Sequence, residues 1–368
     1  GYVGMSVPFA FAMAALVTRR TDEAWLAIVR RWTMVPWTFL TLGLIAGGWW
    51  GYEVLGWGGY WAWDPVENAA LLPWLTATAF IHSSMVAERR RALKVWTLAL
   101  IIATFELTLL GTFLTRSGVI FSVHSFTQSA IGPFFLAAIA ISLSAALALL
   151  VWRLPDLRDE GSIASALSRE SAFLFNNVLL LAFTFTVLFG TLFPLLVEAA
   201  GGGKISVGAP WFNQVNVPIG AALVFLMGVG PALPWGTASW LTLRDRFVLP
   251  LLAGTVAAAS AWALGLRAPY ALLILGLAVF VALIMGRELL LGARARARMT
   301  GDWLAPAAWG LAVRNRRRYG GYAVHLGVLV VAVAISLNKG LLSEATVTLR
   351  AGDDFAFGGY AITYQELD

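Results

Sequence analysis

Long apolar runs separated by short polar segments dominate the chain. A helix needs about 20 predominantly apolar residues to cross a bilayer. Ten runs approach or reach that length, the first and last being short: about 1–18, 32–52, 67–87, 93–114, 133–152, 172–196, 217–241, 247–265, 268–290 and 322–337. The pattern predicts an all-α polytopic membrane protein with about ten transmembrane helices.

Composition agrees with that class, and charge gives an orientation. Of the 368 residues, 59% are hydrophobic and 12% charged, with a mean hydropathy of +0.77, which excludes a soluble domain carrying one attached helix. All but five of the 26 Lys and Arg residues fall in alternate polar segments: 19–31, 88–94, 153–171, 242–246 and 287–321. These segments are expected to face the cytoplasm, which puts the other loops on the outer, periplasmic side. The net charge of +6 then faces anionic lipid and implies no nucleic acid.

The two ends of the chain differ from its middle. Gly1 already lies within an apolar run, so we expect further sequence before it. At the other end, 346–349 and 355–364 alternate apolar and polar residues around Gly-rich segments, which is typical of strands. We predict a transmembrane core over 1–337 and the start of a truncated periplasmic β domain over 338–368.

One segment between two predicted spans is unusually aromatic. Trp57 to Asn68 reads Trp-Gly-Gly-Tyr-Trp-Ala-Trp-Asp-Pro-Val-Glu-Asn, with three Trp and one Tyr in seven positions. Such a composition favours a structured loop at the membrane surface. Asp64-Pro65 followed by Glu67 is typical of a helix start. We call the loop at about 55–70 the tryptophan loop.

The tryptophan loop has two interpretations. Trp and Tyr often form a belt at the membrane interface. They also make a flat surface with polar edges, which suits a large planar ligand that is apolar in the middle and charged at its rim, as haem is. Because the Trp residues gather in one loop beside a helix start, we favour a substrate-haem site. Its expected residues are Trp57, Trp61, Trp63, Asp64, Glu67 and Asn68.

Two of the three histidines lie inside predicted spans. His82 lies six residues before Glu88, and His325 lies seven residues after Arg318, so both are roughly 9–10 Å from the same membrane face. Ionisable residues at such depth need partners. Two imidazoles that face each other across a helix bundle can be the axial ligands of a six-coordinate b-type haem. We therefore predict that His82 and His325 hold the iron of such a haem. A proton relay is the alternative role for this pair.

The tryptophan loop resembles the WWD signature of the haem-handling proteins of cytochrome c maturation. Three further segments are similar to the CcmF family of System I haem lyase subunits in particular: 175–180 (Phe-Asn-Asn-Val-Leu-Leu), 188–194 (Leu-Phe-Gly-Thr-Leu-Phe-Pro) and 206–213 (Ser-Val-Gly-Ala-Pro-Trp-Phe-Asn). The resemblance extends over essentially the whole chain. The contexts of His82 and His325 also match the two histidines that bind the transmembrane haem of that family.

The resemblance implies a cytochrome c haem lyase. Haem would arrive on the chaperone CcmE and be attached by thioether bonds to the Cys-x-x-Cys-His motif of apocytochrome c, with CcmH- and CcmI-type subunits as partners. A transmembrane haem b would reduce the incoming haem, with quinol as a donor. His124, in an outer loop at about 115–132, would be an axial iron ligand of the substrate haem, and Arg116 would pair with a propionate. The family's second periplasmic His precedes the segment that matches Gly1.

Two other classes of function stay open from the residues. One is a haem delivery or export protein that binds haem without forming thioethers. The other is a proton or solute transporter that uses His82 and His325. No side chain is expected to act as a nucleophile, because the attacking thiols belong to the cytochrome. Since the chain has no Cys, reduction of those thiols must come from a partner.

Overall fold

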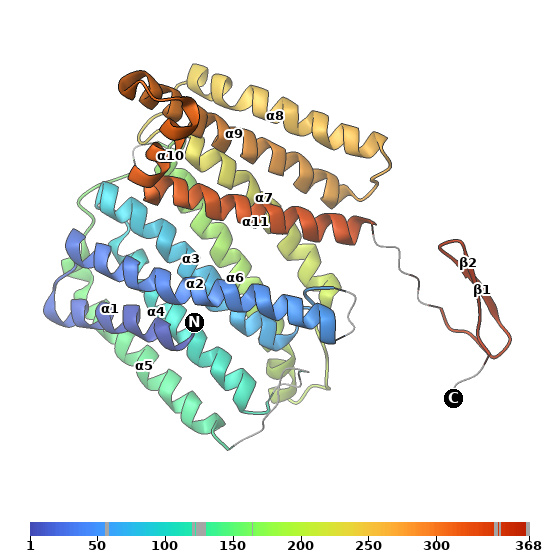
Figure 1. The fold of residues 1–368 in the computed structure, drawn as a ribbon. Coiled ribbons are helices and arrows are strands. Elements are labelled where there is room, and N and C mark those ends of the chain that lie inside the picture. Colours follow the sequence, from blue (N-terminus) through green and yellow to red (C-terminus); the bar gives the residue numbers. More distant parts are fainter. Residues whose placement is uncertain are drawn as a thin grey trace. The chain divides into compact units, whose positions relative to one another are not determined.

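The computed structural model describes residues 1–55, 59–119, 122, 130–163, 165–341, 345 and 347–365. Within these residues the chain is almost entirely helical (Figure 1). The elements are η1 (Val3–Met5), α1 (Ser6–Thr18), α2 (Glu23–Val54), α3 (Pro65–Arg90), α4 (Lys94–Arg116), α5 (Gly132–Arg153), η2 (Leu154–Leu157), α6 (Arg169–Ala199), α7 (Ala209–Ala232), α8 (Trp240–Ala263), α9 (Pro269–Thr300), α10 (Leu304–Arg314), α11 (Arg316–Leu341), β1 (Asp354–Phe357) and β2 (Tyr360–Thr363).

Each of the ten predicted spans lies on a helix, which confirms the all-α membrane class. Among the described residues, eight helices are long and apolar enough to cross a membrane, namely α3 to α9 and α11. The first predicted span forms the shorter helix α1. The second lies in α2, where Trp, Thr and Gly residues lower the hydropathy between the leucines. The chain is therefore a multi-pass membrane protein.

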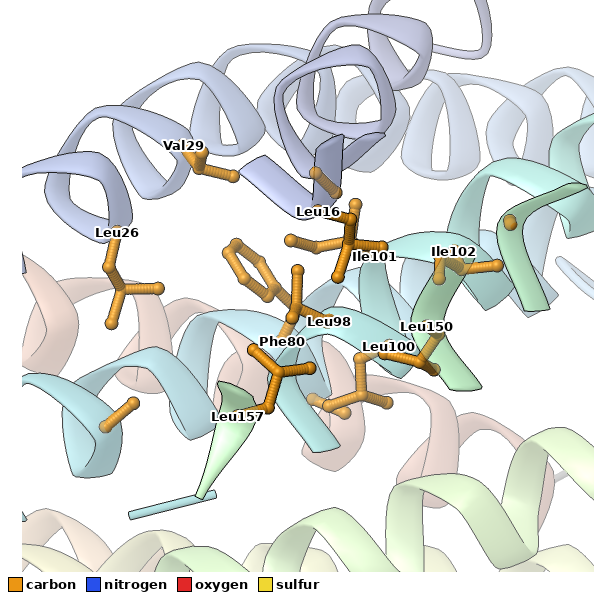
Figure 2. Packing of buried hydrophobic residues seen from close by; sticks show 14 of the residues in the cluster. Leu16, Leu26, Val29, Phe80, Leu98, Leu100, Ile101, Ile102, Leu150 and Leu157 are labelled. Atoms are coloured by element: carbon orange, nitrogen blue, oxygen red, sulfur yellow. The ribbon is translucent and has the colours of Figure 1, made fainter. Parts of the chain in front are cut away.

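The helices form two compact units, Gly1–Val248 and Leu249–Asp368. In the first unit, α3 packs against α2, α4 and α6. Its buried Phe80 meets Leu16 of α1, Val29 of α2 and Leu98 of α4 in the main apolar cluster (Figure 2). Because α3 is surrounded by neighbours, the side chains along it are held by the core of this unit.

Charged side chains satisfy the helix ends on the predicted cytoplasmic side. The guanidinium of Arg169 donates to the carbonyls of Pro231 and Leu233 at the C-terminus of α7, at 2.6 and 2.9 Å. Asp159 accepts from the backbone N–H groups of Leu93 and Lys94, at 2.9 and 3.1 Å, where α4 has no side-chain cap of its own. Helix ends leave such backbone groups without partners, so these contacts fix the loops between spans.

Two predicted boundaries are wrong. Helix α7 runs over 209–232, eight or nine residues before the predicted span at 217–241, because Pro210 starts it and Pro234 follows its end. At the C-terminal end, α11 continues to Leu341, and 347–350 forms no strand. The segment 354–363 does form an antiparallel hairpin, with Phe357 opposite Tyr360 and both turn glycines at positive φ.

Candidate functional site

The N-terminus of α3 fixes the described part of the tryptophan loop. Asp64 is the N-cap residue, and its carboxylate accepts from the N–H of Val66 at 2.9 Å. The carboxylate of Glu67 reaches back to the N–H groups of Ala62 and Asp64, at 3.0 and 3.2 Å. This capping box confirms the predicted helix start. It also means that Glu67, which is buried, holds the loop by hydrogen bonds to its backbone.

Trp63 is attached to α7. Its backbone is left-handed, with φ 60°, which turns the chain into the helix cap. Its indole stacks on Phe212, with ring centroids 5.0 Å apart and planes 11° from parallel. The indole N–H donates to Oδ1 of Asn213 at 2.8 Å. One face and the polar edge of Trp63 are therefore occupied by protein, and the orientation of the ring is set by α7.

Trp61 lies at right angles to Trp63. Their ring centroids are 5.9 Å apart and their planes meet at 89°. The indole N–H of Trp61 is shielded from solvent and has no hydrogen-bond partner among the described residues. A buried donor without a partner is costly, so Trp61 offers a polar edge that an acceptor would satisfy.

Asn68 connects the loop to α6. Its side chain is fully buried and donates to the carbonyl of Trp63 and to the hydroxyl of Thr191, both at 3.0 Å. The structure thus places five expected site residues, Trp61, Trp63, Asp64, Glu67 and Asn68, around the start of α3. It separates their roles, because the two indoles carry the aromatic surface while Glu67 and Asn68 support it from below.

Ser122, in the segment after α4, contacts the tryptophan loop at Asp64. The hydroxyl of Ser122 donates to Oδ2 of Asp64 at 2.7 Å. Arg116 is the last residue of α4 and is exposed. Trp57 and His124, both expected site residues, lie outside the described residues. The bond from Ser122 nevertheless ties the chain two residues before His124 to the start of α3.

Phe212, Asn213 and Thr191 complete the surroundings of the loop, and sequence reasoning assigned them no such role. In the sequence, Phe212 and Asn213 are distinguished only as part of the family-like segment 206–213. A polar residue beside an aromatic one at a helix start is a weak signal on its own. Trp63 and Asn213 are 150 positions apart, so their contact cannot be predicted from local sequence.

His82 has the hydrogen bond that an axial ligand requires. Its Nδ1 lies 2.9 Å from the carbonyl oxygen of Thr78, one turn earlier on α3. A carbonyl can only accept, so Nδ1 carries the proton and the lone pair of the neutral ring lies on Nε2. The ring also packs beside Phe173 of α6, with centroids 5.7 Å apart. Since iron-binding histidines are oriented by such a bond at the other nitrogen, His82 fits a haem ligand.

His325 belongs to the second unit and is half-buried on α11. It lies nine residues after Arg316, where α11 begins, and His82 lies eight residues before Arg90, where α3 ends. At 1.5 Å per residue, each is about 12–14 Å from the Arg-rich end of its own helix. No group of three or more His, Cys, Asp or Glu residues that could hold a bare metal ion occurs among the described residues.

The helices and the tryptophan loop define a multi-pass membrane protein of the cytochrome c assembly class, since residues 1–124 match the family described as "Cytochrome C assembly protein". The chain is 42% identical over its full length to the cytochrome c-type biogenesis protein CycK of Bradyrhizobium diazoefficiens, of which it covers 55%. It is 38% identical to CcmF of Escherichia coli, again over its full length and over 55% of the relative. A solved structure titled "Cytochrome c Heme Lyase CcmF" superposes with a TM-score of 0.71 at 39% identity, covering 91% of this chain and 49% of that one.

The chain thus belongs to the cytochrome c assembly family, in the branch that includes CcmF and CycK. It spans about half the length of the curated relatives it matches.

Proposed function

We propose that this chain is the haem-handling core of a cytochrome c haem lyase. It accepts haem from a CcmE-type chaperone at the tryptophan loop, where the haem is attached to the Cys-x-x-Cys-His motif of apocytochrome c. The observation that carries the proposal is the described part of the tryptophan loop, in which Trp63 is held by Asn213 of α7 and by Asn68, itself bonded to Thr191 of α6, and Trp61 packs edge-on against Trp63. A belt residue needs no such support, whereas a shaped surface does.

The residues of the loop have separate roles in this proposal. Trp61 and Trp63 provide the apolar surface, and the Trp61 indole N–H donates to the rim of the ligand. Arg116 pairs with a propionate. His124 approaches the iron, and the bond between Ser122 and Asp64 supports its placement beside the loop. His124 must later be exchanged for the His of the cytochrome motif.

The covalent step uses groups of the substrates. Each cysteine thiol adds across a vinyl double bond of haem, so that sulfur bonds to one vinyl carbon and hydrogen to the other. No group leaves and no net oxidation occurs. The protein therefore contributes positioning, which converts a reaction between separate molecules into one between aligned groups.

A resident haem b held by His82 and His325 is the second part of the proposal. The hydrogen bond from Nδ1 of His82 to Thr78 supports it, because it leaves Nε2 of His82 with the lone pair that iron requires. When bound, such a haem supplies one-electron chemistry, which would keep the substrate iron ferrous with quinol as the donor.

The arginine distribution supports an orientation with the tryptophan loop in the periplasm and the chain in a bacterial inner membrane. CcmH- and CcmI-type subunits and apocytochrome c are then partners on the periplasmic side.

Variants of the two described indoles test the proposal. The full-length protein is expressed in a bacterium that lacks its own CcmF, and mature cytochrome c is measured by haem staining. Trp61→Ala and Trp63→Ala should abolish most maturation while protein level is retained. Trp32→Ala, on an exposed face of α2, is the matched control and should mature cytochrome normally. Normal maturation by both loop variants would refute a haem site there.

A further inference from the structure

The end of α9, α10 and the start of α11 form a basic region that the proposed haem sites do not include. Residues 294–318 contain seven Arg and one acidic residue, Asp302. Helix α9 has 32 residues. At 1.5 Å per residue it is about 48 Å long, whereas the hydrocarbon core of a bilayer is about 30 Å thick. The Arg-rich end of α9 therefore lies in or beyond the lipid headgroup region.

Helix α10 is amphipathic at this level. Ala307 is fully buried, and Leu311 lies against Gly292 of α9. On the other side of α10, Trp309 is 74% exposed and Val313, one turn later, is 38% exposed. Trp303, just before the helix, is 86% exposed. Exposed tryptophans on a short helix between Arg-rich segments are typical of a helix that lies in the membrane interface.

Arg296 is the charged group at the contact between α9 and α10. A Cβ atom placed on Gly310 would lie 2.9 Å from its Nε and 3.0 Å from its Nη2, so the guanidinium lies directly against the α10 backbone. Its Nε is shielded from solvent and has no hydrogen-bond partner among the described residues. A buried cationic donor without an acceptor is costly, so the site favours an anionic oxygen.

Neighbouring charges favour the same kind of ligand. Arg298 and Arg314 are exposed and form no side-chain hydrogen bond or ion pair within the described part of the chain. By contrast, Arg318 pairs with Glu288 and lies over the ring of Tyr322. Positive charge thus exceeds negative charge beside α10, and an apolar indole surface lies next to it.

We propose that α10 and the end of α9 bind the phosphate group of an anionic phospholipid, with Arg296 as its main ligand and Trp309 as the interfacial anchor. The excess of positive charge favours an anionic headgroup. The exposed indole of Trp309 favours a lipid within a membrane over a free anion in solution. Anionic lipids are concentrated in the leaflet that the arginine distribution assigns to this end of the helices.

Native mass spectrometry of the full-length protein, titrated in detergent with phosphatidylglycerol or phosphatidylcholine, tests the site. Phosphatidylglycerol should bind more tightly than phosphatidylcholine. Arg296→Gln should weaken phosphatidylglycerol binding by about fivefold, since one basic residue near anionic lipid contributes ~1 kcal/mol, and Arg296→Lys should keep most of it. Trp309→Ala, at an exposed position that leaves the fold intact, should weaken binding similarly.

Arg267→Gln is the matched control. This guanidinium also lies over a tryptophan, 5.0 Å from the ring centroid of Trp262, but at the opposite end of α9. The Arg267→Gln variant should bind phosphatidylglycerol as tightly as the unmodified protein does. The proposal is overturned if Arg296→Gln and Trp309→Ala both bind phosphatidylglycerol normally, or if the two lipids bind equally. Displacement of the lipid by excess inorganic phosphate would also overturn it, because the ligand would then be free phosphate.

Discussion

At the scale of single residues, the sequence predicts which side chains are candidate ligands but not the hydrogen bonds that orient them. Depth within a span marks His82 as a ligand candidate, but its hydrogen bond to Thr78 follows from α-helical geometry and rotamer choice, which appear only in three dimensions. The motif predicts Glu67 and Asn68 as members of the haem site. Both are buried and hydrogen-bond to the backbone of the loop, a position that residue type alone does not predict.

The contact between Trp63 and Asn213 gives a prediction at this scale. Trp63→Phe and Asn213→Ala should each lower cytochrome c maturation severalfold, because losing one hydrogen bond of about 1 kcal/mol releases the indole from α7. The double variant should be no worse than either single variant, since both remove the same bond. Haem staining at equal protein level measures this. Strictly additive losses would mean that the two residues act separately.

At the scale of elements, hydropathy predicts that helices exist but not where they end. Spans 67–87 and 93–114 agree closely with α3 and α4, because charged residues bound both. The displacement of α7 arises because Pro210 permits a helix start within a weakly apolar segment. Asp159 capping α4 from a later loop is a tertiary contact, so no local pattern announces it.

The capping box at α3 provides a prediction for this element. Glu67→Gln keeps an oxygen that accepts from Ala62 and Asp64, whereas Glu67→Ala removes both hydrogen bonds. We expect Glu67→Ala to reduce stability by about 1–2 kcal/mol, and Glu67→Gln to reduce it much less. Thermal unfolding of the purified protein in detergent measures the difference. Equal loss in both variants would show that charge, and not capping, is the important property of Glu67.

The exposed ion pairs around α4 have a pH dependence of known sign. The hydrogen bond and positive charge of Lys94, aided by Arg91, hold the pKa of Glu160 below its usual value. A lowered folded-state pKa gives stabilisation that is present above the usual carboxylate pKa and is lost as pH falls through the lowered value. At neutral pH, the unmodified protein should therefore unfold at a slightly higher temperature than Glu160→Gln.

That difference should shrink as pH falls below the usual carboxylate pKa of about 4.3, and it should disappear once pH lies below the lowered pKa of Glu160. Lys94→Gln should show the same pattern, since it removes the partner from the other side. A difference that is unchanged at low pH would contradict this assignment.

At the scale of the whole molecule, composition and Arg distribution are enough to predict a multi-pass helical protein, and the eight span-length helices found among the described residues confirm it. Relations between distant segments could not be predicted from patterns, because contacts such as Asn68 with Thr191 join residues that only the assembled bundle brings together. The chain covers about half the length of its curated relatives, so the activity of the whole relatives is only a proposal for this chain.

The resident haem is a prediction for the full-length protein. Purified protein should show a low-spin b-type absorption spectrum, and His82→Ala or His325→Ala should remove or convert it because one axial ligand is lost. His124→Ala is the control and should leave this spectrum intact. Retention of the low-spin spectrum by both membrane variants would exclude this ligand pair, and absence of haem from the unmodified protein would favour a transporter.

Haem attachment in a purified system tests whether this protein supports formation of the thioether bonds. The full-length protein with its partner subunits is mixed with haem-loaded chaperone and reduced apocytochrome c under reducing conditions, and the intact mass of the cytochrome is measured after acid extraction of free haem. We expect the unmodified protein to yield a cytochrome heavier by one haem that resists extraction, and Trp63→Ala to yield none. Haem that reaches the cytochrome but is fully extractable would contradict this expectation, and would define a delivery protein.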